Sequence, residues 1–192
     1  MKEKTRKLTV MAMLVAISVV LVYLIHFPIF PAAAFLEYDP ADIPILIGAF
    51  AYGPVAGILL TVVASVIQGF TVSAGSGAYG IIMHIIATSV LVLVSGGIYL
   101  VRRTKGGAIV GLILGTIAMG LVMMVANHFI TPAFMGVPTE MVDAMLLPVI
   151  LPFNLIKAGV NSLITVLLYK TVSRHIIHPA ARARKTQDKT EP

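Results

Sequence analysis

The chain has 192 residues, of which 58 % are hydrophobic and only 11 % are charged. Because soluble domains carry about 25 % charged residues, this composition excludes a soluble fold and predicts an all-α integral membrane protein. The formal net charge of +6 does not indicate nucleic-acid binding, because the basic residues lie at predicted helix ends and in one tail, as the positive-inside rule describes. The absence of cysteine excludes disulfides, thiolate metal sites and a cysteine nucleophile.

The first predicted membrane helix covers about residues 6–26. Its basic start and apolar run resemble a signal peptide, but the run is longer than the hydrophobic region of a signal, so we interpret it as a membrane helix. A proline-containing stretch follows, and then a polar segment that holds Glu37, Asp39 and Asp42.

The next apolar stretch is interrupted by Gly53-Pro54. It could form one kinked helix or an antiparallel pair over about 42–52 and 54–70. Gly suits the position after a helix end, and Pro suits the first turn of the next helix. Only the pair places the basic N-terminus, the next basic loop and the C-terminal tail on the same cytoplasmic side, so we predict the pair. The first helix of the pair, ~17 Å long at 1.5 Å per residue, is short for a bilayer core of ~30 Å.

The remaining membrane helices are predicted at about 80–101, 108–130 and 148–173. The acidic connection over residues 131–147 has room for a short surface helix. The result is a compact bundle of six transmembrane helices in a multi-pass cell-membrane protein, with both termini inside. All Lys and Arg residues except Lys157 then fall on the cytoplasmic side. We expect a membrane domain over residues 1–175 and a basic, disordered cytoplasmic tail over residues 176–192.

Lys157 lies well inside the last predicted helix, where a charged side chain costs about 2.5–3.5 kcal/mol. Asn154 precedes it by three residues and Asn161 follows it by four, so the three side chains share one helix face. Snorkelling of Lys157 to the membrane surface is one interpretation. The polar stripe favours the other, in which Lys157 is a donor that faces a ligand cavity.

Other polar side chains lie singly within the predicted helices. Asn127 and His128 are near the outer end of the fifth helix, Gln68 is near the end of the third, and His84 is in the fourth. Isolated amides and histidines commonly make hydrogen bonds between helices, so these residues carry less weight than the stripe.

Small residues recur at helical spacing. Ala12 and Ala16 are four apart in the first helix, and a second set follows in the helix pair: Gly48, Ala51, Gly53, Ala56 and Gly57. Small faces let helices approach closely in lipid, which serves either packing within the bundle or docking to another membrane subunit. The sequence also contains no P-loop, HExxH or Gly-x-Ser-x-Gly motif. We therefore expect neither an enzyme nor an ATPase site in this chain.

Four stretches carry a resemblance to a known family. In chain order they are Ala12-Met-Leu-Val-Ala16, Glu37-Tyr38-Asp39-Pro40-Ala41-Asp42-Ile43-Pro44, Asn127-His128-Phe129-Ile130-Thr131-Pro132 and Pro152-Phe153-Asn154-Leu155-Ile156-Lys157. In order and spacing the chain resembles the S components, the substrate-binding membrane subunits, of energy-coupling-factor (ECF) vitamin transporters. The riboflavin-specific type is the most similar.

This resemblance implies a six-helix fold with a vitamin site near the outer face, closed by the long loop after the first helix. It implies that Lys157 and Asn127 are polar ligands of the isoalloxazine edge. The further residues that we expect to bind the ligand are Asn154, Asn161, Tyr38 and Asp39.

The resemblance also implies partners. Ala12 and Ala16 would dock onto a transmembrane coupling subunit, which works with two cytoplasmic ATPases. Riboflavin, or its phosphate FMN, would be the transported ligand and not a cofactor, and no metal or nucleic acid is expected. An S component for thiamine or biotin is the main alternative. A small membrane enzyme or a channel is less consistent, because the sequence shows neither a cluster of acids and histidines at one depth nor polar residues along a whole pore.

Overall fold

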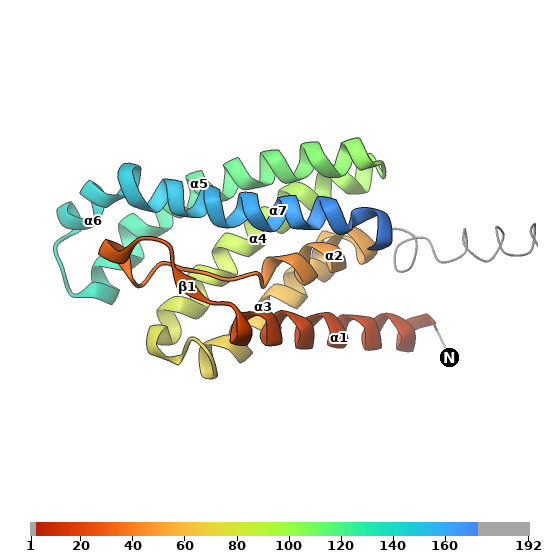
Figure 1. Cartoon of the computed structure of the whole chain (residues 1–192), viewed down its shortest axis with the longest axis horizontal. Helices are drawn as coiled ribbons and strands as arrows, with labels where there is room; N and C mark the ends of the chain where they lie inside the picture. Colours follow the sequence, from red (N-terminus) through yellow and green to blue (C-terminus); the bar gives the residue numbers. More distant parts are fainter. Residues whose placement is uncertain (1–2, 173–192) are drawn as a thin grey trace, which may run out of the picture.

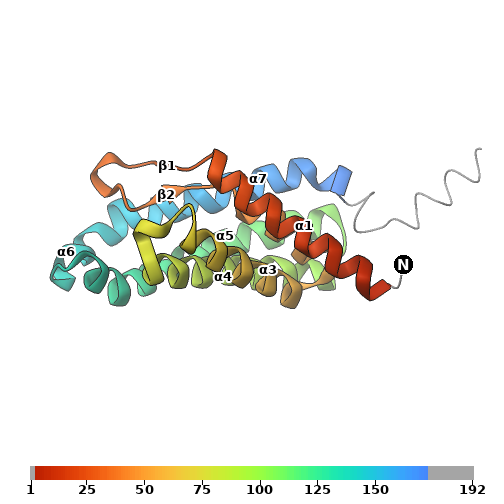
Figure 2. The same ribbon diagram turned by 90° about the horizontal axis from the view of Figure 1, so that it is seen from below.

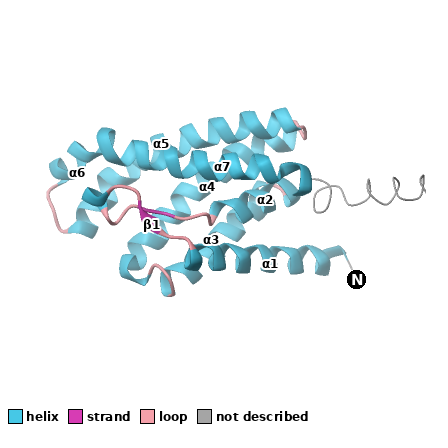
Figure 3. Ribbon diagram, viewed as in Figure 1, coloured by secondary structure: helices cyan, strands magenta, loops and turns pink. Residues whose placement is uncertain are grey.

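Seven α-helices make up most of residues 3–172, the part of the chain that the computed structural model describes. In chain order they are α1 (Glu3–Leu24), α2 (Asp42–Tyr52), α3 (Pro54–Phe70), α4 (Gly77–Val101), α5 (Lys105–Met135), α6 (Thr139–Met145) and α7 (Leu151–Val172). The only strands in this part of the chain form one two-residue pair, so the predicted all-α class is confirmed (Figure 3).

Four helical stretches are long and apolar enough to cross a bilayer. They contain α1, α4, α5 and α6 with α7. Helices α2 and α3 are apolar but shorter, at 11 and 17 residues, and span ~17 and ~26 Å at 1.5 Å per residue. Six transmembrane crossings therefore remain a prediction, in which α2 and α3 need protein around them to cross.

Helices α2 and α3 form the predicted antiparallel pair. Helix α2 ends at Tyr52, Gly53 takes a left-handed φ of 91°, and Pro54 opens α3. A side chain at Gly57 of α3 would meet Ala49 of α2, and one at Gly48 of α2 would overlap Leu60 of α3. The two helices therefore pack closely against each other. The conformational freedom of glycine and the fixed φ of proline explain why the chain reverses here.

The small residues of α2 and α3 pack inside the bundle. Helix α2 is buried along almost its whole length and contacts α1, α3, α4 and α7. Helices α4 and α5 also approach closely, because a Cβ at Gly111 would lie 2.8 Å from the Ser95 carbonyl oxygen. Helix α1, in contrast, lies along one side of the bundle, as Figures 1 and 2 show, and both Ala12 and Ala16 are exposed.

The loop between α1 and α2 folds back over the bundle. Strands β1 (Phe27–Pro28) and β2 (Glu37–Tyr38) pair antiparallel, with Phe27 opposite Tyr38. Between them, the 3₁₀ turn Pro31–Ala33 brings a second apolar cluster together against α6 and the start of α7. The buried members of this cluster are Ala33, Leu36, Val142, Ile150 and Phe153. The loop is thus packed onto the end of the bundle where α6 lies (Figure 1).

Several helix boundaries differ from the predicted ones, most of all at the end of α5 and the start of α7. Helix α5 does not end at Ile130 but continues through Pro132 to Met135, where Gly136 ends it with a left-handed φ of 66°. A proline lacks only its own N–H, and one interior proline so near a helix end removes a single helical hydrogen bond, which the bundle tolerates. The last long helix, α7, begins at Leu151, after the predicted start at about 148, and the π-helical segment Leu146–Ile150 leads into it.

The predicted short surface helix is present as α6. The first turn of α1, the turn between α4 and α5, and the last turn of α7 lie at one end of the bundle, opposite α6 (Figure 1). The predicted topology, with six crossings and both termini inside, places these three segments on the same side of the membrane. The predicted tail, residues 176–192, lies outside the described residues.

Candidate functional site

A cavity opens in the half of the bundle that contains α6. Its wall comes from the segment between α1 and α2, the end of α3, the start of α4, the second half of α5 and the first half of α7. Its volume is about 150 Å³. This is enough for roughly ten water molecules at 10–15 Å³ each. A space of this size exceeds a packing defect and can hold a small organic molecule.

Most of the cavity wall is apolar and aromatic. Phe134 of α5 lies between two other rings, with its centroid 5.6 Å from that of Tyr79 and 6.3 Å from that of Phe35. Met83, Met119, Met123, Ile130 and Phe153 extend this surface. Aromatic faces and flexible thioethers suit a flat, apolar ring system.

The polar side of the cavity is built on the short segment ahead of α2. Asn161 of α7 holds this segment with three hydrogen bonds: its Nδ2 donates to the Asp39 carbonyl oxygen at 3.0 Å and to Asp42 Oδ2 at 2.9 Å, while its Oδ1 accepts from Tyr38 Oη at 3.0 Å. Ser18 of α1 adds a hydrogen bond to the Ala41 carbonyl oxygen at 3.0 Å. The segment is therefore fixed between α1 and α7 and buried.

Lys157 forms an ion pair with Asp39. Its Nζ lies 2.5 Å from Asp39 Oδ2, and the two residues are 7 % and 9 % exposed. Burial alone would raise the pKa of the Asp39 carboxyl, but the Lys157 ammonium and the N–H of Ala41 outweigh it and hold that pKa below its usual value. Lys157 therefore does not snorkel: it has a buried counter-ion and faces the cavity.

Asp42 lies behind the cavity wall, at the start of α2. Its carboxylate accepts from Thr88 Oγ1 at 2.7 Å, and the His84 Nε2 atom lies 3.7 Å from its Oδ1. The His84 Nδ1 atom is 2.7 Å from Ser65 Oγ. Helices α2, α3, α4 and α7 thus meet in one buried polar cluster beside the cavity.

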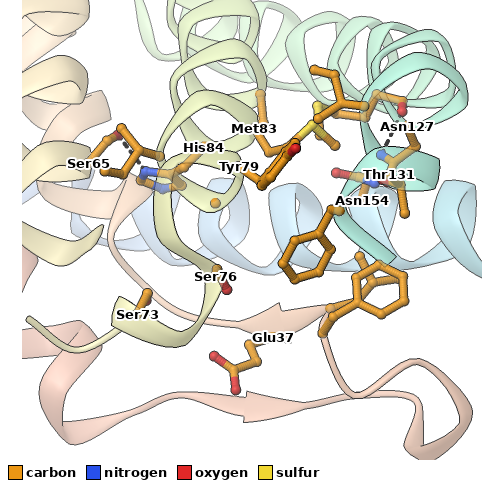
Figure 4. A pocket seen from close by; sticks show the side chains of 18 of the residues that line it. Glu37, Ser65, Ser73, Ser76, Tyr79, Met83, His84, Asn127, Thr131 and Asn154 are labelled. Atoms are coloured by element: carbon orange, nitrogen blue, oxygen red, sulfur yellow. Dashed lines mark hydrogen bonds between the residues drawn. The ribbon is translucent and has the colours of Figure 1, made fainter. Parts of the chain in front are cut away.

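A second polar group lies on α5 and α7. Asn127 donates from Nδ2 to the Met123 carbonyl oxygen at 2.7 Å and accepts from Thr131 Oγ1 at 2.7 Å. Asn154 donates to the Ile150 carbonyl oxygen at 2.8 Å. Each amide has two N–H groups and two acceptor lone pairs, so both retain capacity for a ligand. Figure 4 shows Ser65 and His84 on one side and Asn127, Thr131 and Asn154 on the other, with Met83 and Tyr79 between them.

The structure brings four of the predicted ligand-binding residues to the cavity wall. These are Lys157, Asn127, Asn154 and Asp39. Tyr38 and Asn161 do not line the cavity but hold the segment that carries Asp39. The exposed face of α1 with Ala12 and Ala16 is separate from the cavity. Among residues 3–172, no group of three His, Asp or Glu side chains is placed to hold a metal ion.

Sequence reasoning missed three residues of this region. Asp42 was placed with Glu37 and Asp39 in the polar segment after the first helix and given no role of its own. Gln68 and His84 were given little weight, although both line the cavity. A signal was present in the spacing: Ser65 and Gln68 are three apart on α3, and His84 and Thr88 are four apart on α4, so each pair shares a helix face.

The model of one protein family matches residues 6–169, and it describes the substrate-specific component of ECF transporters. Among curated proteins, the riboflavin transporter RibU of Staphylococcus aureus is 31 % identical over 180 residues, which cover 91 % of this chain and 94 % of RibU. The riboflavin transporter FmnP of Bacillus subtilis is 32 % identical over 174 residues, which cover 86 % of this chain and 91 % of FmnP.

One solved structure has a similar fold. It comes from work on the structure and mechanism of the S component of a bacterial ECF transporter. The TM-score is 0.80 at 31 % identity, and the match covers 90 % of this chain and 98 % of the other. The helix bundle is therefore shared over nearly its whole length.

Proposed function

The chain belongs to the family of ECF transporter substrate-specific components, and from this premise we propose that it binds riboflavin for import across the cell membrane. It is a multi-pass membrane protein of a transporter family. Two curated relatives that cover most of its length are named riboflavin transporters. The resemblance noted in the sequence and the matched family therefore agree.

The observation that carries the proposal is the combination of an aromatic and apolar surface and separate polar groups in one cavity. The isoalloxazine ring of riboflavin is planar and largely apolar, with carbonyl oxygens and ring nitrogens along one edge. Phe134, Tyr79 and the cavity methionines offer the apolar faces. Asn127, Asn154 and Lys157 offer donors and acceptors for the edge.

Transport requires partners, because the sequence contains no nucleotide-binding motif. We propose that the exposed face of α1 with Ala12 and Ala16 docks onto a transmembrane coupling subunit, which two cytoplasmic ATPases drive. The exposure of both alanines supports this assignment, since small side chains let a neighbouring helix approach closely in lipid. The small residues of α2 and α3 do not compete for this role, because Gly48 and Gly57 pack within the bundle.

The proposal is tested by titrating riboflavin with the protein purified in mild detergent. We expect quenching of flavin fluorescence at one riboflavin per chain, and a flavin absorbance spectrum if ligand copurifies. Thiamine, biotin and FMN serve as comparison ligands in the same assay. Unchanged riboflavin fluorescence together with binding of thiamine or biotin would assign the chain to another vitamin.

A further inference from the structure

Helix α1 contributes no described residue to the cavity wall, yet one of its side chains is bonded to the segment that forms the polar side of the cavity. Ser18 is fully buried, and its Oγ donates to the Ala41 carbonyl oxygen at 3.0 Å. Hydroxyl groups within helices commonly bond the carbonyl one turn earlier in the same helix, as Thr61, Ser95 and Thr165 do here. Ser18 instead bonds a residue 23 positions away, so its hydroxyl holds two parts of the fold together.

Ala41 links this contact to the cavity wall. Its N–H donates to Asp39 Oδ1 at 3.0 Å, while Asp39 Oδ2 lies 2.5 Å from Lys157 Nζ. Three hydrogen bonds therefore connect Ser18 with Lys157, and the last two residues of this series, Asp39 and Lys157, line the cavity. All four residues are buried, so a bond that is lost from the series is not readily replaced by a bond to water.

The segment that carries Asp39 is held from two sides. From α7, Asn161 donates to the Asp39 carbonyl oxygen and to Asp42 Oδ2. From α1, Ser18 donates to the Ala41 carbonyl oxygen. Removal of the Ser18 hydroxyl leaves the attachment to α7 in place, but it releases the backbone at Ala41 from α1. The Asp39 carboxylate is then less firmly placed, and so is the Lys157 ammonium that it pairs with.

We propose that Ser18 is a positioning residue for ligand binding, which acts through Ala41 on the Asp39–Lys157 pair. This inference rests on the proposed riboflavin function, and it gives α1 a part in binding although α1 does not line the cavity. Ser18 follows Ala16 by two residues, or ~3 Å along the helix axis. A subunit that docks at Ala16 and displaces α1 therefore changes the affinity for the ligand through Ser18.

A double-mutant cycle on the purified protein in mild detergent tests this connection. We expect Ser18→Ala to weaken riboflavin binding about threefold to tenfold, as the loss of one hydrogen bond predicts. In protein that already carries Lys157→Met, Ser18→Ala should cause no further loss, because the residue through which Ser18 acts is absent. A purely structural role of Ser18 would lower the affinity by the same factor in both backgrounds. Flavin fluorescence titration measures all four affinities.

Ser95→Ala is the matched control. Ser95 is a fully buried serine of α4 that bonds the Leu91 carbonyl oxygen of its own helix and does not line the cavity, so its removal should leave the riboflavin affinity unchanged in both backgrounds. Thermal unfolding without ligand checks that each variant is folded at the assay temperature. Unchanged affinity in Ser18→Ala, or an equal loss in both backgrounds, would overturn the positioning role. Failure of the wild type to bind riboflavin would overturn the proposed function itself.

Discussion

Lys157 and Asp39 are joined by a buried ion pair that connects α7 to the segment ahead of α2. The pair explains how a lysine can lie within an apolar helix, because its attraction to the carboxylate offsets the free-energy cost of desolvating the ammonium. The other two N–H groups of Lys157 remain for a ligand in the cavity that it lines. We therefore expect Lys157 to serve both the ion pair and the ligand, so substitution should affect both.

We expect Lys157→Met to weaken riboflavin binding about tenfold to a hundredfold, as the loss of a charge-assisted hydrogen bond predicts. It should also lower the unfolding temperature, because it leaves the Asp39 carboxylate buried without a counter-ion. Adding Asp39→Asn should restore the unfolding temperature but not the affinity. Fluorescence titration and thermal unfolding in detergent measure the two effects. Wild-type affinity in the single variant would show that Lys157 only pairs with Asp39.

Helix α1 differs from α2 and α3 in how it uses small residues. Ala12 and Ala16 are exposed, whereas Ser18, on another face of the same helix, is fully buried and bonds the Ala41 carbonyl oxygen. The same helix thus has one face for the bundle and one that is free for a partner. Small residues in α2 and α3 serve the opposite purpose, since a Cβ at Gly57 would meet Ala49.

A large side chain at the free face should block docking without affecting the cavity. We expect Ala12→Leu and Ala16→Leu to abolish riboflavin uptake by cells, while the purified variants keep wild-type riboflavin affinity. Ala144→Leu, at an exposed position on α6, is the matched control and should leave uptake intact. If Ala16→Leu reduced binding and uptake together, the face would be needed for the fold and not for a partner.

The two ends of the whole molecule differ in charge. The turn between α4 and α5 carries Arg102 and Arg103, and it lies at the same end as the start of α1 (Figure 1). The opposite end carries Glu140 and Asp143 on α6. From the positive-inside rule we predict that the basic end faces the cytoplasm, which would place the cavity in the outer half, where an external vitamin arrives.

Because the chain has no cysteine, single cysteines report this topology directly. Ser76→Cys should react with a membrane-impermeant maleimide in intact cells, since Ser76 lies in the loop ahead of α4. Lys105→Cys, at the opposite end, should react only after the cells are opened. Labelling of Lys105→Cys but not of Ser76→Cys in intact cells would show that the protein has the opposite orientation in the membrane.

The local sequence pattern was sufficient to predict the features that depend on residue type and helical spacing alone. Gly53-Pro54 ended one helix and began another because backbone conformation at these two residues hardly depends on tertiary contacts. The shared face of Asn154, Lys157 and Asn161 followed from helical periodicity. The apolar composition fixed the helical class, because a chain in lipid must satisfy its backbone hydrogen bonds within its own segments.

Tertiary structure decided which polar residues became partners. Asp39 and Lys157 are 118 residues apart, and Asp42 and Asn161 are 119 apart, so no local pattern could pair them. Two acids that belonged to an outer loop by sequence became part of a buried cluster because the loop folds back between α1 and α7. Packing likewise determined that Gly57 was internal and Ala16 exposed, since equal small-residue spacing permits either contact and only the neighbouring helices select one.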